Sequence, residues 1–423
     1  MKKVYIHSIG CVENALEGSR IEEFFRRNDW QVIAEPAEAD LLLVNTCGVI
    51  GSKERQSLRK IQELEKQKRV DSRLVVCGCL PDINEKALNG FVSEDIVTPG
   101  TMSRFDKIAD GEMSIEDVAS NQLDSKHMRR RLQLIHGVRG VVEAFQRWKI
   151  PVPPHFKRVF YCFEEPDWHY IKISSGCLHH CTFCAIKFAK GDLVSKPVGD
   201  ILNEFREGIS QGHRSFVLCG DDTGAYGRDL GTDLVGLLEQ MIEEDGDFKI
   251  YIRNFEPVWF IRMFERLKPV LMSGKVRTVT LPIQSGSPGI LRAMKRGHSI
   301  EDFRRCVEEL HRDVPDLLII THVMVGFPGE TGRDFRDTLR LISDLRFDGV
   351  SPEQYYPRPR IPSLTLPNPV PAWRRRWRLI RTFLYVYYVV YFNRFNWIKL
   401  RNSHRRQTIG GMKEWDPTTI TKS

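Results

Sequence analysis

The chain has 423 residues and a formal net charge of +8, with 41% apolar and 28% charged residues. This length exceeds what a single compact core accommodates, so two or three domains are expected. The composition argues against a collagen-like or a disordered chain. The N-terminus, MKKVYIHSIG, leads straight into a strand-like alternation and shows no apolar signal core, so we expect a cytoplasmic location.

Basic residues are concentrated near the C-terminus. Between Trp373 and Arg406 the chain has ten Lys or Arg residues and no Asp or Glu. Removing those ten charges from the total of +8 leaves −2 for the rest of the chain. The basic character therefore belongs to the tail.

Ten cysteines require an explanation. In a reducing compartment a disulfide framework is not expected, and metal binding or catalysis is the favoured role for part of the set. Cys162, Cys219 and Cys306 have no partner at ligand spacing, so we interpret all three as buried core residues.

Residues 1–101 alternate between strand and helix patterns. We predict an amphipathic helix at Ala15–Arg27 and a charged helix at Ser52–Lys66. Apolar runs predict strands at Lys3–Ser8, Asp40–Asn45, Leu74–Cys77 and Asp95–Thr98. Strands separated by helices of this length predict a parallel sheet with helices on both faces. No G-x-G-x-x-G follows the first strand, which argues against a dinucleotide site there.

The pattern becomes polar over residues 102–166, which we interpret as a linker with one helix, Lys126–Gln146. Residues 167–361 return to regular alternation. The predicted strands are Trp168–Ser174, Phe216–Cys219, Lys249–Arg253, Thr278–Ile283 and Leu317–Val325. The predicted helices between them are Val198–Gln211, Asp233–Glu243, Ile300–Arg312 and Gly332–Leu345. The expected fold is therefore α/β: an N-terminal parallel-sheet domain followed by a full or partial (β/α) barrel, with chemistry at the carboxyl ends of its strands.

Residues 362–423 form a different kind of segment. Prolines break regular structure at its start, and aromatic and apolar residues then recur at helical spacing among the basic residues. Its uninterrupted apolar run, Thr382–Phe392, is eleven residues long. A membrane-spanning helix needs about 20 residues, so this run is too short to span a bilayer. We expect a basic, aromatic helical tail.

The strongest chemical signal is GCLHHCTFCAIKFAKG, in which Cys177, Cys181 and Cys184 follow a predicted strand at C-x3-C-x2-C spacing. Three thiolates can hold three irons of a 4Fe–4S cube and leave the fourth iron open for a reactant. The alternative is a zinc site completed by His179 or His180, but structural zinc usually uses paired C-x2-C spacing and four ligands. Strand-to-helix context favours the iron–sulfur interpretation.

A second set of cysteines is dispersed along the chain. Cys11, Cys47 and Cys79 each follow one of the first three predicted strands, whose carboxyl ends converge at one edge of a parallel sheet. This convergence favours a second cluster with one open iron over three unrelated buried thiols. Cys77 competes as the third ligand, and side-chain alternation favours Cys79 because Cys77 still lies within the apolar strand.

These residues and several further blocks resemble the radical-SAM methylthiotransferases over about residues 1–360. The matching blocks are GCVENALEGSR (10–20), VNTCGV (44–49), GCL (78–80), SSGCLHHCTFC (174–184), LCGDDTGAYGRD (218–229), LPIQSGSPGILRAMKRG (281–297) and VGFPGET (325–331). The resemblance implies a radical-SAM cluster on Cys177, Cys181 and Cys184, and an auxiliary cluster on Cys11, Cys47 and Cys79. It also implies S-adenosylmethionine (SAM) as a cofactor and an external one-electron donor such as flavodoxin or ferredoxin.

The activity that this resemblance implies is replacement of an unactivated C–H by C–S–CH3. Reductive cleavage of SAM gives a 5′-deoxyadenosyl radical, which removes the hydrogen, and sulfur and a methyl group are then added. The cofactors supply this chemistry, while the protein contributes placement and exclusion of water. The sequence accordingly assigns no acid–base catalytic residue.

The SAM pocket is expected at the strand ends of the barrel. The candidates are Gln284, Ser285, Ser287, Gly326, Gly329 and Glu330, with Asp221, Asp222 and Arg253 as weaker ones. A turn or salt-bridge role is nearly as well supported for each of them. The glycines would allow close approach of backbone.

Three features depart from the family pattern. Lys187 and Lys190 stand where the family usually has Pro and Arg, and PRPRIP (357–362) replaces the PRPGT turn. No run of short strands corresponding to the C-terminal TRAM barrel follows Pro362; the basic aromatic tail stands in its place. That tail could bind RNA, lie on an anionic membrane surface, contact a protein partner, or pack its aromatic stripe on the barrel.

The sequence thus predicts a methylthiotransferase acting on a tRNA adenosine derivative or on a protein or peptide residue. The missing TRAM barrel motivates an alternative, a radical-SAM sulfur-inserting enzyme that acts on a small molecule or a biosynthetic precursor peptide. A non-enzymatic, metal-stabilised RNA-binding protein is a third and less favoured hypothesis.

Overall fold

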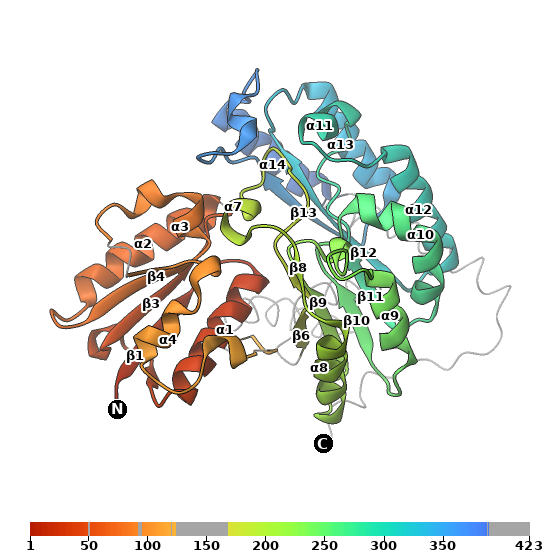
Figure 1. Ribbon diagram of the computed structural model, residues 1–423. Helices are drawn as coiled ribbons and strands as arrows, with labels where there is room; N and C mark the ends of the chain where they lie inside the picture. Colours follow the sequence, from red (N-terminus) through yellow and green to blue (C-terminus); the bar gives the residue numbers. More distant parts are fainter. Residues whose placement is uncertain (50, 92–94, 120, 124–167, 387, 389–423) are drawn as a thin grey trace, which may run out of the picture.

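The computed structural model describes residues 1–49, 51–91, 95–119, 121–123, 168–386 and 388. Within them, a small α/β domain and a larger α/β domain lie side by side (Figure 1). Both central sheets have only parallel strand pairs, which confirms the predicted fold class. The predicted helix at Lys126–Gln146 and Cys162 lie outside the described residues.

The N-terminal sheet has the order β2-β1-β3-β4-β5. Its strands are β1 (Lys3–Ser8), β2 (Gln31–Ile33), β3 (Leu41–Thr46), β4 (Arg73–Gly78) and β5 (Ile96–Val97). Its helices are α1 (Val12–Arg27), α2 (Gly51–Gln67), α3 (Leu80–Ile83) and α4 (Arg104–Ala109). Every residue of β3 is buried, because helices cover both faces of a parallel sheet. The short strand β2 was not predicted.

Alternate side chains of the central strands supply two separate apolar layers. On one face, Leu41 and Leu43 pack with α1 and α4; on the other, Leu42 and Val44 pack with α2. The first layer also contains Phe105 and Val118. The compact N-terminal unit therefore extends to Val118, beyond the predicted boundary at residue 101, and the stretch expected to open the linker belongs to its core.

The second domain is built on a six-stranded parallel sheet of order β13-β12-β11-β10-β9-β6, an open, partial barrel. Its strands are β6 (His169–Lys172), β9 (Ser215–Cys219), β10 (Lys249–Ile252), β11 (Val276–Thr280), β12 (Leu318–Val325) and β13 (Gly349–Gln354). Its helices are α7 (Ile186–Lys190), α8 (Val198–Ser210), α9 (Leu234–Glu243), α10 (Pro257–Met272), α11 (Pro288–Ala293), α12 (Ile300–Asp313), α13 (Gly332–Leu345) and α14 (Ala372–Val386). A short antiparallel pair, β7 (Ser174–Ser175) and β8 (Val194–Ser195), precedes α8.

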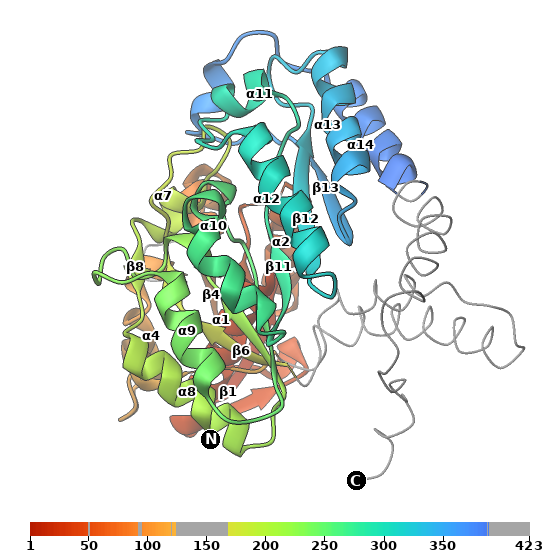
Figure 2. The same cartoon turned by 90° about the vertical axis from the view of Figure 1, so that its right-hand side faces the viewer.

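Helices α8, α9, α10, α12 and α13 lie side by side along one face of this sheet (Figure 2). Sequence signals explain where several of them begin: the Ser299 side chain caps α12, and Thr331 forms a capping box with Asp334 at α13. The predicted helical tail is confirmed as far as α14, which packs against α13 and β13. None of the described helices is long and apolar enough to cross a membrane.

The N-terminal domain covers the opposite face of the six-stranded sheet. Val12 and Leu16 of α1 form one apolar cluster with Trp168, Tyr170 and Tyr251 of the larger domain. The two domains are therefore joined by a continuous apolar contact, and the carboxyl ends of their strands meet along this boundary.

Candidate active site

Cys11, Cys47 and Cys79 lie at the carboxyl ends of β1, β3 and β4, which are neighbours in the sheet. Cys11 is the N-cap of α1 and Cys79 the N-cap of α3. All three line one cavity, so the convergence predicted from the sequence is present.

The structure separates Cys79 from its neighbour Cys77. Cys77 is 1% exposed, packs in the N-terminal core, and donates its thiol proton to the Val44 carbonyl at 3.5 Å. Cys79 instead lines the cavity. Cys219 and Cys306 are completely buried in apolar clusters, as expected for core residues.

The second trio lies in the loop between β7 and α7. The Cys177 and Cys184 sulfurs accept hydrogen bonds from the backbone N–H groups of His179 at 3.4 Å and Ile186 at 3.5 Å. The Cys181 sulfur accepts one from Nη1 of Arg296 at 3.6 Å. Hydrogen bonds to cysteine sulfurs stabilise the anionic, metal-bound form and tune an iron–sulfur cluster.

Both trios face the same cavity, of about 280 Å³, at the boundary between the two domains. The polar and charged side chains that complete its lining are Glu13, Asn14, His179, Lys190, Asp221, Asp222, Arg253, Asn254, Glu256, Gln284, Arg296 and His322. Two groups of three thiols across one cavity are what two facing clusters, each with an open corner, would require.

The protonation of these thiols fits a site that binds metal. Burial raises the pKa of Cys79 and of Cys184 to about 12, so without a metal these thiols are neutral near pH 7. A bound metal supplies the charge that turns buried thiols into thiolates. In the described residues no three His, Cys, Asp or Glu side chains are grouped tightly enough to hold one metal ion.

Lys190 is the cation of the cavity that acts on the thiols of Cys11 and Cys79. Its Nζ lies 3.1 Å from Oδ1 of Asp221, and its side chain is 13% exposed. Burial by itself lowers the pKa of Lys190, but the negative charge of Asp221 acts in the opposite direction, and the pKa lies well above its usual value. Lys190 thus keeps its positive charge beside the thiols.

A buried polar network surrounds the loop that carries Cys177, Cys181 and Cys184. Asp222 accepts hydrogen bonds from the Trp259 indole at 2.9 Å and the Gly224 N–H at 3.1 Å, and its Oδ2 lies 3.2 Å from Nε2 of His179. Arg296 forms a buried ion pair with Glu256. These contacts hold the loop and its cysteines in place.

Three of the predicted SAM-pocket residues, Asp222, Arg253 and Gln284, line the cavity, as does Asp221. Gln284 follows β11 with φ of 67°, an uncommon conformation for a residue with a side chain. It is held by hydrogen bonds of its N–H to His322 O at 2.9 Å and of its carbonyl to Met324 N at 2.8 Å.

The other predicted SAM-pocket residues are not among those that line the cavity. Ser285 contacts the Thr338 hydroxyl at 3.2 Å, and Ser287 caps α11. Glu330 is buried against Arg378 of α14 and accepts a hydrogen bond from the Gly326 N–H at 2.6 Å. A β-carbon at Gly326 would lie 2.4 Å from Arg375 of α14, which explains the glycine there without a ligand.

Sequence reasoning missed several cavity residues. Arg296, Glu256 and His322 gave no motif signal of their own, although Arg296 lies in the MKRG block. Burial lowers the pKa of His322 to about 4, so this imidazole is neutral at physiological pH. Position was a signal only for Glu256, which follows β10 and is the N-cap of α10. His322 lies within β12, and Arg296 lies in the loop after α11.

The two domains match two different protein families. Residues 3–98 match the family described as Uncharacterized protein family UPF0004, and residues 171–342 match the Radical SAM superfamily. A Pyrococcus abyssi protein named "Probable threonylcarbamoyladenosine tRNA methylthiotransferase" is 30% identical over 369 residues, covering 85% of this chain and 78% of that protein. The chain belongs to the radical-SAM methylthiotransferase family.

The methylthiotransferase assignment confirms the resemblance found in the sequence. The threonylcarbamoyladenosine tRNA methylthiotransferases of Xenopus laevis and Homo sapiens are 30% and 29% identical, and the matches cover 61% and 60% of those proteins. The radical SAM methyltransferase TsrM from Kitasatospora setae has the same overall fold, with a TM-score of 0.56 at 13% identity over 86% of this chain and 77% of that one. As a radical-SAM methylthiotransferase, this protein is an enzyme that uses SAM and 4Fe–4S clusters and acts on a macromolecular substrate.

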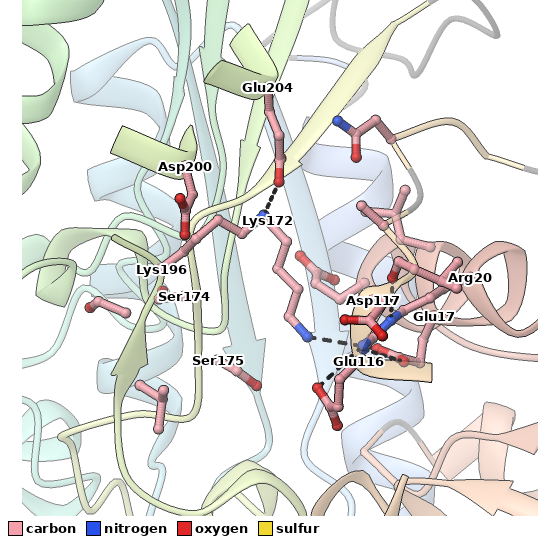
Figure 3. A pocket seen from close by; sticks show the side chains of 17 residues that line it. Glu17, Arg20, Glu116, Asp117, Lys172, Ser174, Ser175, Lys196, Asp200 and Glu204 are labelled. Carbon is pink, nitrogen blue, oxygen red and sulfur yellow. Dashed lines mark hydrogen bonds and ion pairs between the residues drawn. The ribbon is translucent and has the colours of Figure 1, made fainter. Parts of the chain in front are cut away.

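A second, more open cavity of about 490 Å³ lies between α1 and the β6–β8 region of this methylthiotransferase (Figure 3). Carboxylates outnumber cations in its lining: Glu13, Glu17, Glu116, Asp117, Asp200 and Glu204 against Arg20, Lys172 and Lys196. Lys196 pairs with Glu204 at 2.6 Å, and Lys172 lies 3.7 Å from Glu17 (Figure 3). Glu13 lines both cavities, so they meet at this residue. The acidic excess makes this opening unsuited to phosphate groups.

Proposed function

We propose that the protein is a tRNA methylthiotransferase whose six cavity cysteines hold two 4Fe–4S clusters. Cys177, Cys181 and Cys184 would hold the radical-SAM cluster, and Cys11, Cys47 and Cys79 the auxiliary cluster. When bound, the two clusters supply reductive cleavage of SAM and a site for the sulfur that is transferred. The observation that carries the proposal is that both thiol trios line a single cavity.

The protein's own residues position the reactants. Gln284, Asp222 and Arg253 line the cavity on the barrel side and are the candidates to orient SAM there. Val12 and Leu16 pack on Trp168, Tyr170 and Tyr251, and this contact holds the two domains, and with them the two trios, on either side of the cavity. A radical formed in this cavity would have to be held next to one C–H of the substrate, which is a matter of proximity and orientation.

The substrate that we propose is a threonylcarbamoyladenosine in tRNA, by analogy with the names of the relatives. Such a substrate implies a cytoplasmic location and an external one-electron donor such as flavodoxin or ferredoxin. Since the acidic opening disfavours phosphates, the tRNA backbone would have to approach the cavity from another side.

Anaerobic incubation of the reconstituted protein with SAM, dithionite and total tRNA, followed by nucleoside mass spectrometry, tests the proposal. We expect a new nucleoside heavier than threonylcarbamoyladenosine by one methylthio group in place of hydrogen. A variant with Cys11, Cys47 and Cys79 all replaced by Ser should still release 5′-deoxyadenosine but form no such nucleoside. If the intact protein cleaves SAM and leaves every nucleoside unchanged, tRNA is not the substrate, and a protein or precursor peptide becomes the next candidate.

A further inference from the structure

Helix α14 has a fixed orientation on the barrel. Its inner face is formed by Arg378, Thr382 and Val386, all of them buried. Arg378 is paired with Glu330 and also donates to the Glu330 carbonyl at 3.0 Å. Arg375 donates to the carbonyl of Tyr355 at 3.1 Å. Because both ion-pairing and backbone contacts hold one face inward, the opposite face is exposed. At its start, Trp373 and Trp377 also border a shallow hollow against Phe335 of α13.

The outer face of α14 carries large apolar side chains, whereas the exposed face of a surface helix is ordinarily polar. Trp373, Trp377, Ile380 and Leu384 recur at intervals of four, three and four residues, so they form one stripe on the helix. They are 66%, 51%, 50% and 65% exposed. Of the thirteen large apolar side chains exposed in the described residues, six lie between Trp373 and Tyr388. A concentration of this kind on one outward face indicates a surface that another apolar phase covers.

Arginines flank the stripe on both sides. Arg374, Arg376 and Arg381 are exposed, and the helix has no Asp or Glu. The guanidinium groups of Arg374 and Arg381 lie 5.1 Å and 5.2 Å from the ring centres of Trp373 and Trp377. Tryptophan with arginine beside it is typical of helices in the boundary region of a bilayer, where the ring sits among headgroups and the cation faces lipid phosphates.

An anionic bilayer fits this surface better than RNA does. RNA-binding surfaces present cations to phosphates and aromatic rings to bases. Here the middle of the outer face is Ile380 and Leu384, which offer neither charge nor a ring, whereas both gain from leaving water for the acyl boundary. Every charged side chain within α14 is positive, which suits an anionic lipid surface. Since α14 is too short to cross a membrane, it would lie parallel to the surface.

We propose that α14 is a membrane-docking helix, which places this methylthiotransferase on the surface of a bilayer containing anionic phospholipid. The stripe of Trp373, Trp377, Ile380 and Leu384 enters the headgroup–acyl boundary, and the flanking arginines bind lipid phosphates. The surface is independent of the thiol cavity, so the proposal does not depend on the identity of the substrate.

Vesicle flotation of the full-length protein tests this docking. Vesicles of phosphatidylcholine with phosphatidylglycerol should bind the protein at least tenfold more tightly than vesicles of phosphatidylcholine alone, and added salt should weaken the binding. A wild-type protein that floats with neither vesicle would overturn the proposal, and this result requires no variant.

Matched variants locate the binding on α14. Ile380→Glu combined with Leu384→Glu should reduce binding to the anionic vesicles at least tenfold. Val70→Glu combined with Leu230→Glu, which changes two exposed apolar side chains elsewhere, should leave it unchanged. Circular dichroism and iron content confirm that each variant is folded. If the α14 variant still floats like the wild type, the docking helix is refuted; if it instead loses tRNA affinity while the wild type never floats, the surface is an RNA contact.

Discussion

Nη1 of Arg296 lies 3.6 Å from the sulfur of Cys181, and the same guanidinium is paired with the buried carboxylate of Glu256. Arg296 therefore links one proposed cluster ligand to a charge in the body of the barrel. Burial raises the pKa of Glu256 to about 7, and Arg296 acts in the opposite direction by favouring its ionised form.

We predict that Arg296→Gln weakens retention of the cluster on Cys177, Cys181 and Cys184. Partners that orient a metal ligand typically contribute about 10–100-fold in metal affinity. Iron loss to a chelator, followed over time, should be faster by that order than in the wild type. The control is Arg292→Gln, which changes an exposed arginine four residues earlier. Equal iron loss in both variants would show that the contact of Arg296 with Cys181 has no role in holding the cluster.

A contact between Gly51 and Tyr356 joins the two domains. A β-carbon at Gly51 would lie 2.4 Å from the Tyr356 ring. We predict that Gly51→Ala lowers the free energy of unfolding by about 1–3 kcal/mol, as overpacking does. Gly199→Ala, with nothing within 4 Å of the added carbon, should be neutral or stabilising by up to about 1 kcal/mol. Urea denaturation measures both.

The same contact can be tested by a double-mutant cycle. If the Tyr356 ring causes the clash, Tyr356→Ala should remove most of the cost of Gly51→Ala, with a coupling energy of about 1 kcal/mol or more. Strictly additive effects would mean that the domains do not pack as described here.

Removal of Arg378 should destabilise the barrel. Its partner Glu330 is 4% exposed, and loss of one partner of a buried ion pair typically costs about 3–5 kcal/mol. We expect this loss in urea denaturation of Arg378→Ala at a pH above the Glu330 pKa of about 7, where Glu330 is ionised. For Arg374→Ala, on the exposed side of α14, we expect a change below about 0.5 kcal/mol. Similar effects of the two substitutions would argue against the docking of α14 through its inner face.

The raised pKa of Glu330 predicts that the stability of the protein depends on pH. Burial raises its pKa to about 7, although Arg378 acts to lower it, against an ordinary value of 4.5. The folded protein therefore binds more protons than the unfolded chain between these values, and the contribution of Glu330 to stability is complete below about pH 4.5 and lost as the pH rises through about 7. The stability of the wild type relative to Glu330→Gln should fall over this window by an amount on the order of 2–3 kcal/mol. A difference that stays constant from pH 4.5 to 7.5 would contradict the buried, protonated acid.

The two thiol trios could be predicted because the position of each cysteine next to a strand or within a short motif can be read from the nearby sequence. Cys11, Cys47 and Cys79 each follow a strand, and parallel strands end at one edge. Cys79 differs from Cys77 because β4 ends at Gly78, so Cys77 stays in the strand core while Cys79 begins α3. The helix α10 was missed although Phe260, Phe264, Leu267 and Leu271 recur at helical spacing, because the internal Pro269 is a signal against a helix.

The buried charges could not be predicted in the same way. Whether Glu330 faces a ligand or a cation depends on Arg378, which lies 48 residues later and reaches it only through the packing of α14. The link between Arg296 and Cys181 spans 115 residues. Such pairs are set by tertiary packing, and no local period or motif spacing reports them.

Iron content of reconstituted protein, with a Mössbauer spectrum, tests most directly whether six thiols form two separate cluster sites. Two complete cubes correspond to about eight irons per chain, and one cube to about four. We predict about eight irons for the wild type and about four for each of two triple variants, Cys11/Cys47/Cys79→Ser and Cys177/Cys181/Cys184→Ser. A Cys11/Cys47/Cys79→Ser variant that binds as much iron as the wild type would contradict the account.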